Sequence, residues 1–137
     1  MNLLIVDDSE TDRFVLEQSL QDHKDAVGSP LEIDFAENAE QAIDRATRQN
    51  YSLILLDISM PGRDGFYVLQ NLRQSLPSTA PPIYMLSSST HDRDIAKAYK
   101  LLANGYLVKP SSLSDYDSLA LTCLALADKL QLPKTLH

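Results

Sequence analysis

The segment Leu53–Gly62, LILLDISMPG, decides how the rest of the chain is interpreted. Its first four residues are apolar, a pattern typical of a parallel strand that is buried on both faces. Asp57 follows where that strand should end, and the pair Pro61-Gly62 then forces a turn. Because open α/β sheets bind ligands beyond the carboxyl ends of their strands, Asp57 becomes a candidate site residue if other strands bring polar groups to the same edge.

Length and composition indicate a globular protein of ordinary type. A chain of 137 residues fits one domain, and its 44% hydrophobic and 23% charged residues are typical of soluble proteins. No apolar run approaches the roughly 18 residues that a membrane span needs. The start, Met1–Val6, lacks the basic region of a signal peptide. The single cysteine, Cys123, excludes an internal disulfide, so we expect a cytoplasmic protein.

The net charge of −7 argues against two classes of partner. A nucleic-acid-binding domain needs a basic surplus to neutralise phosphates, and this chain has none. The same charge argues against docking on an anionic membrane surface. We therefore expect no nucleic acid and no membrane among the partners.

Apolar strands alternate with amphipathic helices along the chain. The expected strands cover residues 3–6, 31–36, 53–56, 83–86 and 106–108. The expected helices cover about 10–22, 38–49, 65–75, 91–102 and 112–131, with Asn38 and Thr90 as N-caps. Their inward residues are expected to be Phe14, Val15 and Leu20, then Phe66, Leu69 and Leu72, then Ile95, Ala98 and Leu102, and finally Leu113, Tyr116, Ala120, Cys123, Leu124 and Ala127.

Five strand–helix units in so short a chain predict an α/β fold with a parallel sheet and helices on both faces. The common solution at this size is a flavodoxin-like three-layer α/β/α sandwich with the strand order 2-1-3-4-5. The strand at 31–36 alternates apolar residues with acids, which indicates an edge position. We expect one domain over residues 1–132, followed by a frayed tail at 133–137.

Polar residues stand at the ends of four of the expected strands. Asp7-Asp8 ends the first strand, Asp57 the third, Ser87 the fourth and Lys109 the fifth. Carboxylates packed together repel, so at pH 7 they need a proton or a cation, and Mg²⁺ prefers oxygen ligands of this kind. A lysine and a serine beside them suit phosphate oxygens. The set therefore predicts a site that places a phosphoryl group on one carboxylate.

These motifs resemble the receiver domain of the response regulators of two-component signalling, including the chemotaxis receivers. Asp7-Asp8, Asp57, Met60-Pro61-Gly62, Asp64-Gly65, Ser87 and Lys109-Pro110 stand in the family's order and spacing. The resemblance covers nearly the whole chain. It implies that Asp57 accepts a phosphoryl group from the phosphohistidine of a histidine kinase. It also implies a phosphoacceptor rather than an enzyme with a separate catalytic domain.

The resemblance further implies a metal site. Asp8 and Asp57 would bind Mg²⁺ through their carboxylates, and the backbone carbonyl of Ser59 would be a third ligand. Asp7 would orient metal-bound water. Mn²⁺ could substitute for Mg²⁺.

The resemblance also implies roles for the residues around the phosphoryl group. Ser87 would bond a phosphoryl oxygen, Lys109 would pair with one, and the Lys109–Pro110 peptide is expected to be cis. Tyr106 would rotate into the space that Ser87 leaves. This movement would alter the surface formed by the helix at 91–102, the strand at 106–108 and the helix at 112–131, through which the signal passes to a partner.

No output motif follows the receiver pattern, so we expect a single-domain response regulator. Its partners would be a histidine kinase or a histidine phosphotransfer protein, and a downstream protein that the sequence does not name. The segment 95–113, with Tyr99 and Tyr106-Leu107, is weakly similar to the single-domain response regulators that work with phytochromes. Leu121 falls off the inward stripe of the last helix, which leaves a homodimer open.

Three functions remain as alternatives to one another. The first is the phosphorylatable switch, and the second is a pseudo-receiver that binds proteins without taking phosphate, which the complete acid set disfavours. The third is an enzyme of the same architecture. A flavodoxin would open its first strand onto a phosphate loop, and an aspartate-nucleophile phosphatase would carry an acid where Ser59 stands. Because neither Ser59 nor Ser89 readily orients an attacking water, we expect a long-lived phosphoryl group.

Overall fold

The structure of the protein is a computed structural model that describes residues 1–28, 30–77 and 81–128. Its parallel sheet contains β1 (Asn2–Val6), β2 (Glu32–Ala36), β3 (Leu53–Leu56), β4 (Ile83–Ser87) and β5 (Gly105–Val108). Its helices are α1 (Glu10–Asp22), α2 (Ala39–Arg48), α3 (Gly65–Ser75), α4 (Asp92–Lys100) and α5 (Tyr116–Ala127), with a short 3₁₀ helix at Lys24–Ala26.

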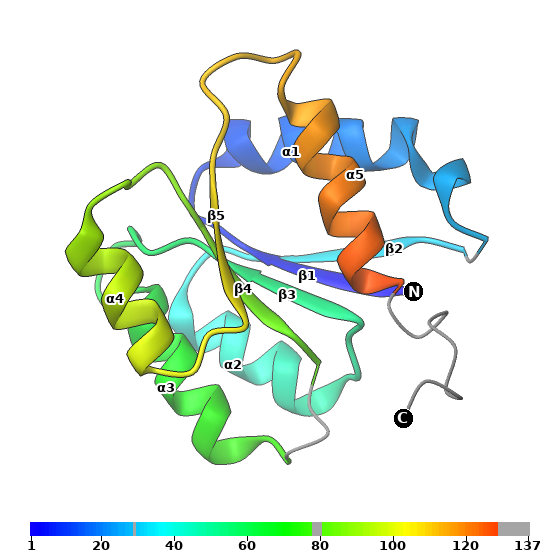
Figure 1. The fold of residues 1–137 in the computed structure, drawn as a ribbon. Helices are drawn as coiled ribbons and strands as arrows, with labels where there is room; N and C mark the ends of the chain where they lie inside the picture. The colour runs from blue at the N-terminus through cyan, green and yellow to red at the C-terminus, as the bar shows by residue number, and fades with distance from the viewer. Residues whose placement is uncertain (29, 78–80, 129–137) are drawn as a thin grey trace, which may run out of the picture.

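The strand order is β2-β1-β3-β4-β5 and every pairing is parallel, which confirms the predicted flavodoxin-like order. Figure 1 shows three layers, in which α1 and α5 cover one face of the sheet and α2, α3 and α4 cover the other. β2 lies at an edge and is only partly buried, as its alternation of acids and apolar residues predicts. The strand boundaries differ from the predicted ones by a single residue at most.

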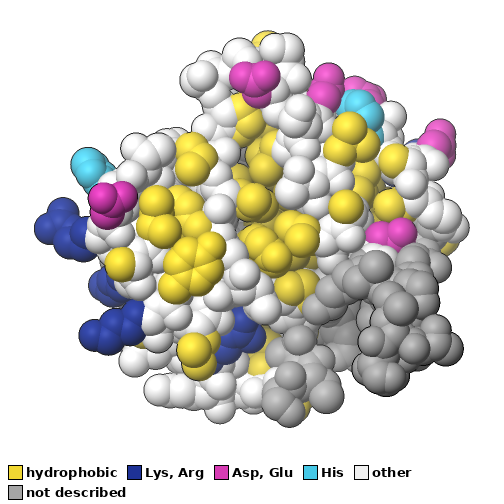
Figure 2. Space-filling view, in the orientation of Figure 1, with side chains coloured by type: hydrophobic (Ala, Val, Ile, Leu, Met, Phe, Trp, Pro, Cys, Tyr) yellow, Lys and Arg dark blue, Asp and Glu magenta, His cyan; other side chains and the backbone are white. Residues whose placement is uncertain are grey.

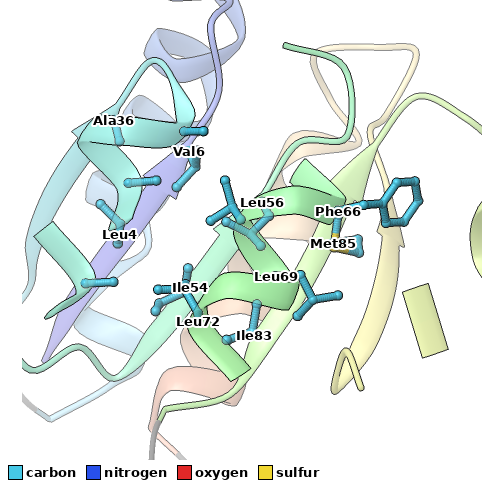
Figure 3. Packing of buried hydrophobic residues seen from close by; sticks show 14 of the residues in the cluster. Leu4, Val6, Ala36, Ile54, Leu56, Phe66, Leu69, Leu72, Ile83 and Met85 are labelled. Carbon is cyan, nitrogen blue, oxygen red and sulfur yellow. The ribbon is translucent and has the colours of Figure 1, made fainter. Parts of the chain in front are cut away.

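Alternate residues of the central strands serve two separate cores. Leu4 and Ile54 pack on the α2–α3–α4 side, whereas Leu3 and Leu53 pack on the α1–α5 side. Figure 3 shows the first core, in which α3 lies over β3 and β4. A strand covered on both faces must be apolar at every position, which is why the run Leu53–Leu56 contains no polar residue.

Side-chain caps fix where three helices begin. The Ser9 Oγ accepts a hydrogen bond from the backbone N–H of Asp12 (3.2 Å), and the Asn38 Oδ1 accepts one from Gln41 (2.9 Å). The Asp64 Oδ1 accepts one from Tyr67 (3.0 Å). The predicted Asn38 cap is thus confirmed.

Two predicted helix starts are wrong. Thr90 is not a cap: α4 begins after His91, which makes no side-chain capping bond, and the Ser89 Oγ instead accepts the His91 N–H (3.2 Å). Helix α5 begins at Tyr116 rather than near residue 112, because Ser112 and Asp115 hydrogen-bond to each other (2.9 Å) in a turn. The predicted end of this helix and the predicted tail at 133–137 lie outside the described residues.

Three predicted inward residues are wrong. Phe14 is 59% exposed, because the buried side of α1 runs through Leu16 and Leu20. Leu102 is 66% exposed, since it follows the end of α4 with a φ of 71° and so leaves the helical stripe. Leu113 is 73% exposed because it precedes α5. The remaining predicted inward residues of α3 and α5 are buried, and Leu121 is exposed as expected.

Candidate functional site

Two neighbouring strands bring three carboxylates together at the carboxyl edge of the sheet. Asp7 and Asp8 follow β1 and Asp57 follows β3, and the pairing of Val6 with Leu56 places these strand ends side by side. Carboxylate oxygens of the three residues lie within 4.8 Å of one another. Asp7 and Asp57 are buried and Asp8 is exposed. The predicted convergence of these acids is confirmed.

Backbone hydrogen bonds and one close approach hold the acids in place. The Asp57 N–H donates to the Val6 carbonyl (2.9 Å), and the Ser9 N–H donates to the Asp7 carboxylate (2.9 Å). A Cβ atom at Gly65 would lie 2.1 Å from the Asp57 carbonyl oxygen, so only glycine lets α3 begin this close to the site. Gly65 therefore has a steric role that its place in the motif did not reveal.

Lys109 reaches into the acid cluster from the end of β5. Its Nζ lies 2.7 Å from an Asp7 oxygen, 2.8 Å from an Asp12 oxygen and 3.2 Å from an Asp57 oxygen. The Lys109, Asp7 and Asp57 side chains are 8%, 5% and 9% exposed, so the ion pairs with Asp7 and Asp57 are largely shielded from water, whereas Asp12 is 38% exposed. Asp12, in the first turn of α1, is a site residue that the sequence did not indicate. Its spacing from Ser9 points only to helix capping, and its pairing with Lys109 joins residues 97 positions apart.

Burial and charge change the proton affinities in this cluster. Burial raises the pKa of Asp57 from 3.8 to about 6, Lys109 lowers it and the Asp7 carboxylate raises it. Burial acts to lower the pKa of the Lys109 ammonium, but its carboxylate partners outweigh burial and raise that pKa above its ordinary value. Lys109 is therefore a cation at neutral pH, and it faces more carboxylates than it can neutralise.

The donor set fits a hard divalent cation. Carboxylate oxygens are the ligands that Mg²⁺ prefers, and opposite ligands of an octahedral Mg²⁺ lie about 4.2 Å apart. Asp7, Asp8 and Asp57 offer oxygens within 4.8 Å of one another, so small side-chain movements bring them to that spacing. A cation here would also offset the excess negative charge around Lys109.

The other predicted site residues lie around the same edge. Ser87 ends β4, the neighbour of β3, and its buried Oγ accepts a hydrogen bond from the Ser89 N–H (3.1 Å). The Tyr106 hydroxyl donates to the Ser89 carbonyl (2.8 Å). Ser59 follows Asp57 by two residues and is exposed.

The prediction of a cis Lys109–Pro110 peptide is wrong. No peptide bond within the described ranges is cis, and this one is among them. A proline lowers the preference for trans to only about 0.5–1 kcal/mol, so the dipeptide alone does not decide the isomer.

Known proteins resemble this chain in sequence and in fold. The transcriptional regulatory protein ResD of Bacillus subtilis is 36% identical over 110 residues, which are 80% of this chain and 42% of ResD. The chain therefore spans less than half the length of that relative. Within the described ranges, no helix has the length and apolarity that crossing a membrane requires.

Two solved structures share the whole fold. The response regulator TrrA of Thermotoga maritima, in complex with Mg²⁺-BeF, is 31% identical, with a TM-score of 0.73 over 91% of this chain and 97% of that one. The phosphorylated cyanobacterial phytochrome response regulator RcpA is 22% identical and shows the fold alone, with a TM-score of 0.81 over 97% and 96% of the two chains. Residues 3–119 match the response regulator receiver domain, the phosphoacceptor domain of two-component signalling, and the chain belongs to this family.

Proposed function

We propose that this protein is a phosphorylation-dependent switch in which Asp57 accepts a phosphoryl group from the phosphohistidine of a histidine kinase or a histidine phosphotransfer protein. The observation that carries the proposal is the position of Asp57, which lies 3.2 Å from the Lys109 ammonium and within the cluster formed with Asp7 and Asp8. This arrangement supplies a nucleophile, a cation for a phosphoryl oxygen and ligands for a divalent metal.

The carboxylates of Asp8 and Asp57 and the backbone carbonyl of Ser59 would hold a divalent metal ion, and Asp7 would orient water beside it. Mg²⁺ fits this all-oxygen set, and Mn²⁺ fits it as a substitute. When bound, such an ion would supply charge neutralisation for the transferring phosphoryl group. The TrrA structure, which contains Mg²⁺-BeF, supports this assignment by analogy.

The transfer requires an ionised Asp57. A pKa of about 6 leaves most of this carboxylate ionised at pH 7 and above. A carboxylate oxygen of Asp57 attacks the phosphorus atom, the P–N bond to the donor histidine breaks, and the imidazole nitrogen keeps the electron pair and takes up a proton. Lys109 and the Ser87 hydroxyl bind the phosphoryl oxygens of the product.

The surface formed by α4, β5 and α5 transmits the signal to a downstream protein. Five of the six exposed large hydrophobic residues in the described ranges lie on these elements or their connections: Tyr99, Leu102, Val108, Leu113 and Leu121. Figure 2 shows hydrophobic side chains gathered between α4 and α5. Tyr106 links this surface to the site through its hydrogen bond to Ser89, in the loop that follows Ser87. A second copy of the chain is the alternative occupant of this surface.

Phosphotransfer profiling tests the proposal. Autophosphorylated histidine kinases of the host are mixed one by one with the protein in Mg²⁺, and transfer of the label is followed over time. We expect one kinase to transfer rapidly to the wild type and not to Asp57→Asn. Asp44→Asn, a charge-matched change at an exposed site on α2, should be labelled like the wild type. Equal labelling of Asp57→Asn and the wild type would refute the assignment of Asp57.

A further inference from the structure

Three carboxylates surround the Lys109 ammonium, which donates hydrogen bonds to Asp12 and Asp57 and forms an ion pair with Asp7. Asp7 and Asp57 follow strands and belong to the acid cluster that fits a metal. Asp12 does not belong to that cluster and comes instead from the first turn of α1. Its oxygen lies 2.8 Å from the Lys109 Nζ, closer than the 3.2 Å of the Asp57 oxygen.

We propose that Asp12 is a positioning residue that holds the Lys109 ammonium away from the phosphoryl position and so weakens the hold of the site on a phosphoryl group. The inference rests on the proposed function, because it concerns how Lys109 meets a phosphoryl group on Asp57. A phosphoryl oxygen can approach this ammonium closely only if one of its three carboxylate partners gives way.

Burial decides which partner releases Lys109. The Asp7 side chain is 5% exposed, so leaving it without a cation would cost a large desolvation penalty. The Asp12 side chain is 38% exposed and can turn to water when the ammonium leaves. Asp57 carries the phosphoryl group itself, so of the other two partners Asp12 is the one that exchanges with it.

Charge favours the same conclusion. A divalent cation in the cluster shares the negative charge of Asp7 and Asp57, which weakens their attraction for Lys109. Asp12 lies outside the cluster and keeps its full charge, so it competes with the phosphoryl oxygens for the ammonium. Removing that charge should strengthen binding of a phosphoryl analogue.

The test is a calorimetric titration of the full chain with beryllofluoride at saturating Mg²⁺. We expect Asp12→Asn to bind beryllofluoride about threefold to tenfold more tightly than the wild type, the range of a partly buried ion pair. Asp12→Glu restores the carboxylate and should return the affinity to within about twofold of the wild type. Glu10→Gln is the matched control, since Glu10 is an exposed acid in the same helical turn and forms no ion pair with Lys109.

A merely structural role for Asp12 at the start of α1 predicts a different result. In that case Asp12→Asn would lower the melting temperature and leave the beryllofluoride affinity equal to that of Glu10→Gln, which would overturn the inference. Weaker binding by Asp12→Asn would overturn it too. Failure of the wild type to bind beryllofluoride at any Mg²⁺ concentration would instead overturn the proposed function, and the inference with it.

Discussion

The substitution Asp57→Asn should stabilise the metal-free protein at neutral pH. The Asp57 side chain is 9% exposed and lies beside Asp7, so its ionised form is unfavourable in the folded state. An amide at this position removes the charge and keeps the shape. The expected effect is therefore opposite to that of most substitutions at buried positions.

The magnitude follows from the pKa of Asp57. This pKa rises from 3.8 to about 6 on folding, and each pKa unit is worth about 1.4 kcal/mol, so the ionised form costs at most about 3 kcal/mol. The site opens to solvent at Asp8, and Lys109 loses a partner in the variant. We therefore expect a gain of about 1–2 kcal/mol in the free energy of unfolding at pH 7.

The raised pKa of Asp57 also determines how the free energy of unfolding changes with pH. Between pH 3.8 and about 6 the folded state retains the Asp57 proton that the unfolded state has lost, so this group lowers stability as the pH rises through that window. The advantage of Asp57→Asn over the wild type should accordingly grow by about 1 kcal/mol between pH 5 and pH 7.

Urea unfolding followed by circular dichroism in a metal chelator, at pH 5 and pH 7, measures this difference. Asp25→Asn, at an exposed position of the 3₁₀ helix, is the charge-matched control and should change stability by no more than about 0.5 kcal/mol. A variant no more stable than the wild type at pH 7 would refute the reasoning, as would a gain that is the same at both pH values.

Four further outcomes are expected. Gly65→Ala should cost about 1–3 kcal/mol in the free energy of unfolding, because its Cβ would lie 2.1 Å from a backbone oxygen, whereas Gly28→Ala, with nothing within 4 Å, should be tolerated. In thermal melts, Mg²⁺ at about ten times its Kd should raise the free energy of unfolding of the wild type by about 1.4 kcal/mol. It should leave that of Asp8→Asn unchanged, because this variant lacks a metal ligand. Tyr106→Phe should cost about 0.5–1.5 kcal/mol in urea melts through the lost bond to the Ser89 carbonyl. The phosphoryl group should decay slowly after removal of the donor, and a half-life of seconds would contradict this.

The parts of the fold that depend on local pattern could be predicted from the sequence. The continuous apolar run at Leu53–Leu56 and the helix at Gly65–Ser75 match the structure because hydrophobic period and capping agree there. At the start of helix α5, local pattern does not determine the structure. The residues of the turn at Ser112–Asp115 are compatible with a helix, but the Asp115 N–H bonds to the Ser112 carbonyl three residues back and the Ser112 Oγ bonds to the Asp115 carboxylate, so α5 begins only at Tyr116.

In the site, too, some contacts follow from the sequence pattern and others depend on tertiary packing. Acids at the ends of adjacent strands could be predicted to meet, since strand order follows from topology and Asp7 and Asp57 directly follow the paired residues Val6 and Leu56. The contact between Asp12 and Lys109 could not be predicted. It depends on how α1 packs beside the end of β5, and no local sequence pattern encodes that packing. The steric need for Gly65 likewise depends on how closely α3 approaches the Asp57 backbone.

Intact-mass spectrometry after incubation with acetyl phosphate and Mg²⁺ tests most directly whether Asp57 accepts a phosphoryl group. We predict that the wild type gains one phosphoryl group, that the gain requires the metal, and that Asp57→Asn does not gain it. An unchanged mass of the wild type under saturating donor and Mg²⁺ would contradict the central claim and indicate a pseudo-receiver.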